Sequence, residues 1–255
     1  MQVVILAGGL GTRLSEETSL RPKPMVEIGG KPIIWHIMKI YASYGYTEFI
    51  VCLGYKGYII KEWFANYFLH NSDVTIDIGK NEIKVLNKNG EDWKVTLVDT
   101  GADTMTGGRL KRVEKYIEGD TFMMTYGDGV SDVNVHELVK FHESHGKTAT
   151  ITSVQPAGKF GRLSLEGDKV VEFAEKKDNE SAWINGGFMV LNKKVIPYIS
   201  GDEMPFEKDP LENIAIDGEL MTYKHHGFWH AMDTLQNKNT LEGLWAKGEA
   251  PWKLW

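Results

Sequence analysis

The chain has 255 residues, a formal net charge of −6 and a single cysteine. This length is sufficient for one large α/β domain with a filled core. The acidic balance argues against a nucleic-acid-binding protein, which usually presents a basic face. One cysteine excludes an intrachain disulfide. No apolar run approaches the roughly 20 residues of a membrane-spanning helix, and the N-terminus lacks the charged region of a signal peptide. We therefore expect a cytoplasmic protein with no membrane and no nucleic-acid partner.

Strand-like and helix-like segments alternate along the first part of the chain. Apolar and β-branched runs predict strands at residues 3–6, 48–53, 74–78, 83–86, 95–99, 122–125 and 149–154. Apolar residues at helical spacing predict helices at residues 32–44, 56–69, 108–117 and 135–144. This alternation is typical of the α/β class, and predicts a Rossmann-like, mixed but mostly parallel sheet flanked by helices.

The second part of the chain is less regular. Short strands are predicted at residues 163–165, 170–173, 188–191 and 220–223, and helices at 209–216 and 235–245. No linker, low-complexity tract or internal repeat interrupts the sequence, so we expect a single domain over residues 1–255. Three tryptophans lie within the last eleven residues. They predict either packing of the tail onto its own domain or a subunit interface, because a free aromatic tail would expose a large apolar patch.

A glycine-rich loop directly after the first predicted strand is the most informative feature. It contains three glycines, which let the backbone approach a phosphate group, and it is followed by a hydroxyl and two cations. The residues concerned are Leu6, Ala7, Gly8, Gly9, Leu10, Gly11, Thr12 and Arg13, with Lys23 a short loop later. A dinucleotide fingerprint would need a third glycine where Leu14 stands. The loop therefore favours a nucleoside triphosphate.

Four further motifs occur in order along the chain: Thr104-Met105-Thr106-Gly107-Gly108-Arg109, Tyr126-Gly127-Asp128-Gly129, Asn185-Gly186-Gly187-Phe188 and Trp229-His230-Ala231-Met232-Asp233-Thr234. Together with the glycine loop and Lys23-Pro24-Met25, this set resembles the sugar-nucleotide pyrophosphorylases, the sugar-1-phosphate nucleotidylyltransferases. The resemblance covers nearly the whole chain. It implies a nucleotide-binding half of about residues 1–130 and a sugar-binding C-terminal half of about residues 131–255.

The residues in these motifs are most similar to those of family members that use CTP and glucose 1-phosphate. The resemblance thus implies formation of CDP-glucose and pyrophosphate, with Mg²⁺ as cofactor. In the family such products supply the synthesis of surface polysaccharides such as the lipopolysaccharide O-antigen. Family members are oligomeric, so we also expect a homo-oligomer, for which the family suggests a hexamer.

The nucleotide is expected at the glycine loop. Its backbone N–H groups would bind phosphates, while Arg13 suits the leaving pyrophosphate and Lys23 the α-phosphate. The residues alone leave Arg109 as a helix-surface charge. The resemblance assigns it to the base, because an arginine has only donors and cytosine offers acceptors where uracil carries a proton. Thr104 and Gly127 would complete the nucleotide site.

Two aspartates are candidate magnesium ligands. Asp128 follows an apolar strand between two glycines, a place typical of ligand sites in α/β sheets but also of turns. Asp233 precedes a predicted helix and is equally suited to cap it. The resemblance implies that both bind the metal, and that Arg13, Lys23 and Asp128 are the catalytic residues.

The sugar phosphate is expected at Glu175, Lys176, Asn185 and Gly186, by resemblance. The family pattern Phe-x-Glu-Lys-Pro has Lys177 in place of its proline here. This departure leaves the local backbone less restricted.

Other functions remain open at the level of the sequence. The same chemistry with UTP or dTTP, or with GTP and mannose 1-phosphate, differs in base recognition, for which Arg109 is the discriminating feature. A non-catalytic regulatory subunit that binds sugar nucleotides would not need to retain Arg13, Lys23, Asp128 and Asp233 together. Residues 12–20 are polar and border the cations, and are the candidate for a loop that closes over the triphosphate.

Overall fold

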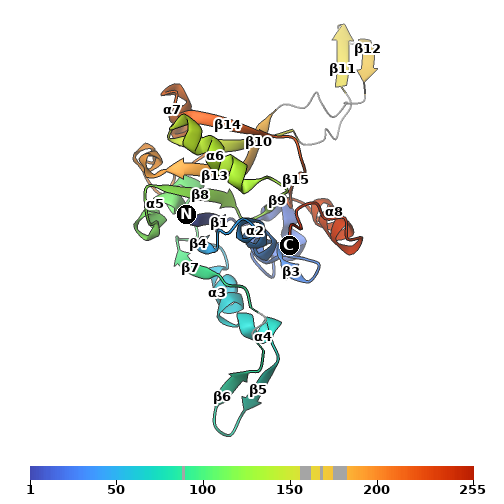
Figure 1. Ribbon diagram of the computed structural model, residues 1–255. Coiled ribbons are helices and arrows are strands. Elements are labelled where there is room, and N and C mark those ends of the chain that lie inside the picture. Colours follow the sequence, from blue (N-terminus) through green and yellow to red (C-terminus); the bar gives the residue numbers. More distant parts are fainter. Residues whose placement is uncertain (88–89, 156–161, 167–168, 175–182) are drawn as a thin grey trace.

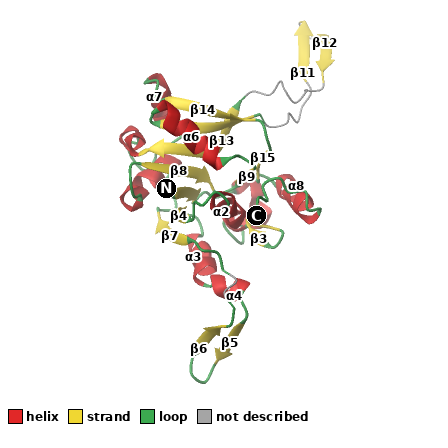
Figure 2. Cartoon of the chain, viewed as in Figure 1, coloured by secondary structure: helices red, strands yellow, loops and turns green. Residues whose placement is uncertain are grey.

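The computed structural model describes residues 1–87, 90–155, 162–166, 169–174 and 183–255. A seven-stranded sheet forms its centre (Figures 1 and 2). Its strands lie in the order β14 (Leu220–His225), β10 (Ala149–Val154), β13 (Ile184–Asn192), β8 (Thr121–Tyr126), β1 (Val3–Ala7), β4 (Glu48–Leu53) and β7 (Lys94–Asp99). Strand β13 is antiparallel to both of its neighbours, and the other pairs are parallel. The predicted mixed, mostly parallel α/β sheet is confirmed.

Helices cover both faces of this sheet. Side chains alternate along β1, so Val3 and Ile5 pack on one face and Val4 and Leu6 on the other. The apolar core on the first face includes residues of α2 (Ile33–Ala42), α3 (Gly57–Ala65), α6 (Val135–His145) and α8 (Leu235–Ala246). The second packs against α5 (Thr106–Val113), the 3-10 segment η4 (Lys193–Tyr198) and α7 (Asp209–Ile216). Because β1 is apolar on both faces, it can only occupy a central position.

The helix predicted at residues 56–69 is interrupted. The structure has α3 and then α4 (Tyr67–Asn71), with Asn66 between them at φ −100° and ψ 18°. The Asn66 side chain donates to the Glu62 carbonyl oxygen across 3.0 Å, a local bond that competes with continuation of the helix. Strands β5 (Val74–Asp77) and β6 (Glu82–Val85) then form a hairpin that projects beyond α4 (Figure 1).

Several short elements escaped prediction because they contain too few residues to show a period. They are η1 (Thr12–Leu14), α1 (Ser15–Thr18), η2 (Lys23–Met25), β2 (Glu27–Ile28), β3 (Lys31–Pro32), β9 (Gly129–Ser131) and β15 (Trp229–Ala231). The segment η3 (Glu114–Tyr116) lies within the helix predicted at residues 108–117 and forms its last, 3-10 turn. Strands β11 (Arg162–Glu166) and β12 (Lys169–Ala174) form a separate two-stranded sheet. Among the described residues, no helix combines the length and apolar character needed to cross a membrane.

The C-terminal tail packs onto its own domain. Trp252 is fully buried, and its indole N–H donates to Nδ1 of the buried His36 on α2 across 3.3 Å. Trp245 and Trp255 also lie beside His36, with ring centroids 4.7 and 6.2 Å away. The first of the two expected arrangements is therefore present, while a subunit interface at the tail stays a prediction.

Candidate active site

The glycine loop follows β1 at the carboxyl edge of the sheet, where ligands of α/β proteins bind. Its glycines differ in what they do. Gly11 has a φ of +65°, which favours glycine, whereas Gly9 has open space where a Cβ would be. A Cβ on Gly8 would lie 2.2 Å from the guanidinium of Arg109. Gly8 is therefore required for close packing of Arg109, and Gly9 is the glycine that leaves the backbone accessible to a ligand.

Arg109 is 4% exposed and connects the ends of three adjacent parallel strands. Its terminal nitrogens donate to five protein oxygens at 2.7–3.2 Å, which belong to Gly8, Leu53, Thr100, Gly101 and Ala102. Burial is the largest influence on this group and lowers the pKa of Arg109. The guanidinium is thus directed at protein oxygens, in contrast to the exposed surface charge that the residues alone suggested.

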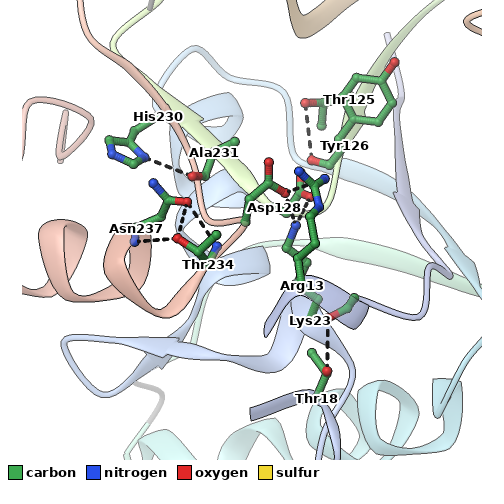
Figure 3. A network of polar contacts seen from close by, with 12 residues as sticks. Arg13, Thr18, Lys23, Thr125, Tyr126, Asp128, His230, Ala231, Thr234 and Asn237 are labelled. Carbon is green, nitrogen blue, oxygen red and sulfur yellow. Dashed lines mark hydrogen bonds and ion pairs between the residues drawn. The ribbon is translucent and has the colours of Figure 1, made fainter. Parts of the chain in front are cut away.

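A lysine and two aspartates meet at the same edge. Figure 3 shows Lys23, Arg13 and Asp128 there. Lys23 Nζ lies 2.6 Å from Oδ2 of Asp128 and 2.7 Å from Oδ1 of Asp233. Arg13 reaches the same oxygen of Asp233 at 3.1 Å, although its side chain is 72% exposed. The structure therefore brings together the four charged residues that the sequence singled out, from segments more than 200 residues apart.

The pairing of two short strands places Asp233 beside Asp128. Ala231 of β15 is opposite Gly129 of β9, and the backbone N–H of Met232 donates to the Asp128 carbonyl oxygen across 2.8 Å. Asp233 does not cap α8, because Thr234 does so through a reciprocal capping box with Asn237. The carboxylate of Asp233 is consequently free to face the cluster.

The charges in the cluster determine the ionisation of Asp233. Burial alone would raise its pKa, but the hydrogen bond and charge of Lys23, with the charge of Arg13, outweigh it and lower the pKa below the usual value. Two carboxylates that converge on one cation offer the hard oxygen ligands that Mg²⁺ prefers. Within the described residues no group of three or more His, Cys, Asp or Glu side chains could hold a metal. A magnesium ion held by Asp128 and Asp233 would thus take its remaining ligands from water and phosphate.

Residues assigned to the nucleotide line this edge. The N–H of Gly127 donates to the Leu6 carbonyl oxygen across 3.0 Å, which holds the glycine against the end of β1. Thr104 is buried beside Gly101 and Gly108, in the loop that supplies acceptors to Arg109. Leu10 is 57% exposed at the tip of the glycine loop.

The sugar-side residues Asn185 and Gly186 start β13, next to the end of β8. Asn185 Nδ2 donates to the Tyr126 hydroxyl across 3.2 Å, and the Trp229 indole donates to the Gly186 carbonyl oxygen across 2.7 Å. Glu175, Lys176 and Lys177 lie outside the described residues. Glu207, which bonds Tyr126, was missed by the sequence analysis, since the segment around it has no pattern beyond a turn before a helix.

Residues 12–20, the candidate closing loop, are fastened at one end. The Thr18 hydroxyl donates to the carbonyl oxygens of Gly11 and Leu14 at 3.1 and 3.0 Å. The Tyr55 hydroxyl donates to the Thr18 carbonyl oxygen across 3.2 Å, and Lys56 donates to that of Ser19. Any closure would therefore move the residues around Arg13 rather than the whole segment.

Comparison with known proteins agrees with this geometry. The family model described as nucleotidyl transferase matches residues 2–236. The chain is 57% identical, over the full length of both sequences, to the glucose-1-phosphate cytidylyltransferase of Salmonella typhi. It is 45% identical, again over both full lengths, to a probable glucose-1-phosphate cytidylyltransferase of Bacillus subtilis. Among solved structures, HddC from Yersinia pseudotuberculosis superposes with a TM-score of 0.70 at 27% identity, covering 96% of this chain and 99% of that one. The chain belongs to the nucleotidyl transferase family.

Proposed function

We propose that the protein transfers a cytidylyl group from CTP to glucose 1-phosphate, giving CDP-glucose and pyrophosphate. The observation that carries the proposal is the cluster of Lys23, Asp128 and Asp233 beside the glycine loop. It combines carboxylates for a divalent metal with a cation for phosphate. The relatives with 57% and 45% identity over their full lengths support CTP and glucose 1-phosphate as the substrates.

The reaction is an in-line displacement at the α-phosphate, and the protein mainly positions groups and neutralises charge. The sugar phosphate oxygen attacks the α-phosphorus, and the bond to the pyrophosphate oxygen breaks. Lys23 approaches the α-phosphate, and Arg13 binds the β- and γ-phosphates of the leaving group. The backbone from Leu6 to Thr12 holds the triphosphate.

Enzymes of this family generally use a divalent metal ion. We assign Mg²⁺ to Asp128 and Asp233. Their carboxylates already lie close together, because both contact Nζ of Lys23. Bound there, the ion would neutralise negative charge on the triphosphate.

Base recognition depends on the segment around Arg109. Its guanidinium holds the carbonyl oxygens of Gly8, Gly101 and Ala102 in place, so it can select cytosine by fixing the backbone around the base. Thr104 and Gly127 contribute to the same site. Glu175, Lys176, Asn185 and Gly186 are assigned to glucose 1-phosphate.

We also expect a homo-oligomer. The β5–β6 hairpin supports this, because Ile76, Ile78 and Ile83 on it are each more than half exposed. Light scattering on the purified protein measures the assembly, and a monomer would contradict the expectation.

The test is pyrophosphate release from CTP, UTP, dTTP, GTP and ATP in parallel, with Mg²⁺ and glucose 1-phosphate. A strong preference for CTP with formation of CDP-glucose is the expected result. Preference for another nucleotide would overturn the base assignment, and release with none of them would favour a binding subunit without catalysis.

Two aspartates that flank opposite ends of β8 provide a test of the metal site and its control. Asp128→Asn should nearly abolish turnover, because it removes a carboxylate from the centre of the cluster. Asp120 directly precedes the other end of β8, is exposed, and its side chain forms no hydrogen bond or ion pair with the described residues. Asp120→Asn should retain full activity. Full activity in Asp128→Asn would overturn the assignment.

A further inference from the structure

Glu207 connects the end of β8 with the start of α5, two parts of the site that no sequence motif joins. It lies between η4 and α7, and its Oε1 accepts a hydrogen bond from the Tyr126 hydroxyl across 2.7 Å. Its Oε2 accepts from the hydroxyl of Thr106, the first residue of α5, across 2.5 Å. Tyr126 ends β8, two positions before Asp128. The carboxylate therefore links the helix that carries Arg109 with the edge of the sheet that faces the sugar.

Donor and acceptor rules determine the direction of each bond in this chain. A carboxylate only accepts, so the Tyr126 hydroxyl must donate its proton to Glu207. With its proton used, the hydroxyl can only accept from Asn185, and Asn185 Nδ2 lies 3.2 Å away.

The hydrogen bond of the Asn185 amide oxygen supports the same orientation of the amide. Asn185 Oδ1 accepts from the backbone N–H of Gly187 across 2.9 Å. One N–H of the Asn185 amide is used by Tyr126, so the second remains available as a donor. If Tyr126 instead donated to Asn185, the amide would have to turn over and would present its oxygen at that place.

Packing, rather than Glu207, fixes the position of the Tyr126 ring. Gly187 has a φ of +86°, and a Cβ on it would lie 2.6 Å from the ring. The ring is therefore confined whether or not the carboxylate is present. What Glu207 adds is the direction in which the hydroxyl proton points.

We propose that Glu207 is a positioning residue of the sugar subsite, which acts through Tyr126 to hold the Asn185 amide with a donor facing glucose 1-phosphate. This inference rests on the proposed assignment of Asn185 to the sugar. Glu207 would thus contribute to the reaction although it contacts neither substrate.

Steady-state kinetics of Glu207→Ala, with each substrate varied in turn, test the proposal. The KM for glucose 1-phosphate should rise about tenfold, the size of one hydrogen bond, while the KM for CTP changes less than about twofold. Glu207→Gln retains an acceptor oxygen and should lose less. Glu203→Gln is the matched control, since Glu203 lies in the same loop, is exposed, and its side chain forms no hydrogen bond or ion pair with the described residues.

A double-mutant cycle separates this role from a structural one. Tyr126→Phe removes the hydroxyl and should raise the KM for glucose 1-phosphate as much as Glu207→Ala does. Glu207→Ala added to Tyr126→Phe should then raise it no further. Independent, additive effects would overturn the proposal, as would equal losses for both substrates with a lowered melting temperature.

A measurement without turnover distinguishes failure of this inference from failure of the proposed function. The side-chain amide resonances of Asn185, followed by ¹⁵N NMR in the free protein, should shift in Glu207→Ala and stay unchanged in Glu203→Gln. Unchanged resonances in Glu207→Ala would overturn the inference even in an active enzyme. If the resonances shift but the protein makes no CDP-glucose, Glu207 does position Asn185 and the proposed substrates are wrong.

Discussion

The guanidinium of Arg109 donates to the carbonyl oxygen of Gly8 across 3.1 Å, and Gly8 has no Cβ in the space that this guanidinium occupies. The first glycine of the loop and an arginine 101 positions later therefore form one packed unit. The same arginine reaches Leu53 and Gly101, so three strand ends share one side chain. The position of the glycine loop therefore depends on a residue of α5 as well as on the loop itself.

Replacement of Arg109 by lysine tests this dependence. A lysine has three donors on one nitrogen and cannot reach five oxygens spread over three strands. We expect kcat/KM for CTP to fall by at least about tenfold, with a reduced preference for CTP over UTP. The nucleotide panel measures both. Arg112→Lys on the same helix, where Arg112 forms an exposed pair with Asp202 at 2.6 Å, is the control and should retain the preference.

Metal removal should separate activity from stability. Lys23 already bridges Asp128 and Asp233 at 2.6 and 2.7 Å, so these carboxylates do not need a metal ion to lie together. Excess EDTA should abolish pyrophosphate release. In the absence of CTP, whose phosphates complete the coordination of the ion, it should leave the melting temperature unchanged. Calorimetry with and without the chelator makes the comparison. A drop of several degrees on chelation would show that the cluster is not assembled by Lys23.

Lys23→Met should alter both properties. It removes the cation at the α-phosphate, and loss of one such contact typically lowers kcat by about 10²–10³-fold. It also leaves two carboxylates facing each other, so the free energy of unfolding should fall by about 1–3 kcal/mol. Added Mg²⁺ should then raise the melting temperature of this variant but not of the wild type. A variant that loses CTP affinity alone, with kcat intact, would contradict the role in the displacement step.

The stability of the fold should depend on pH through His36. Burial lowers the pKa of His36 to about 4, although backbone hydrogen bonds oppose the shift. At pH 7 the imidazole is neutral in both folded and unfolded chains. Below about 6.5 only the unfolded chain takes up the proton, so the free energy of unfolding falls as pH is lowered towards 4, by up to about 1.4 kcal/mol per pH unit.

Urea denaturation between pH 7 and 5 measures this slope. His36→Gln keeps a donor for the Ile28 carbonyl oxygen, to which His36 Nε2 lies at 2.8 Å, and does not titrate. Its stability should vary less with pH than that of the wild type. His70→Gln, at an exposed position, should keep the wild-type slope. Parallel slopes for His36→Gln and the wild type would contradict the assignment.

Strands β1, β4 and β8 in the middle of the sheet were predictable because they are mainly apolar on both faces and each is directly followed by a glycine. The bounds of β4, β10 and α7 agree with prediction to the residue. Short elements were not predictable, since a pair such as β9 and β15 depends on a contact between segments about 100 residues apart. The break at Asn66 depends on one side-chain hydrogen bond, which competes with a helical pattern that is otherwise continuous.

The sequence indicated the charged residues of the site but not how they act. Asp233 was ambiguous between helix cap and ligand, and only the capping box at Thr234 assigns the cap elsewhere. Arg109 reads as a surface charge next to Lys111 and Arg112, because a sequence does not show which face of α5 is buried. Glu207 has no motif at all, and its importance arises from a loop that meets Tyr126 in space.

The reversed direction of β13 has a consequence for how such an enzyme diversifies. Val154 at the end of β10 pairs with Ile184 at the start of β13, so the chain leaves and re-enters the sheet at one point. The segment between these two residues is thus an insertion whose two ends are held together by strand pairing. Its sequence includes Glu175 and Lys176. Because both ends of this segment are fixed by the same strand pair, a change in its length or sequence need not move a strand of the sheet. If Glu175 and Lys176 bind the sugar as proposed, sugar preference could therefore change while the glycine loop and Arg109 keep their places.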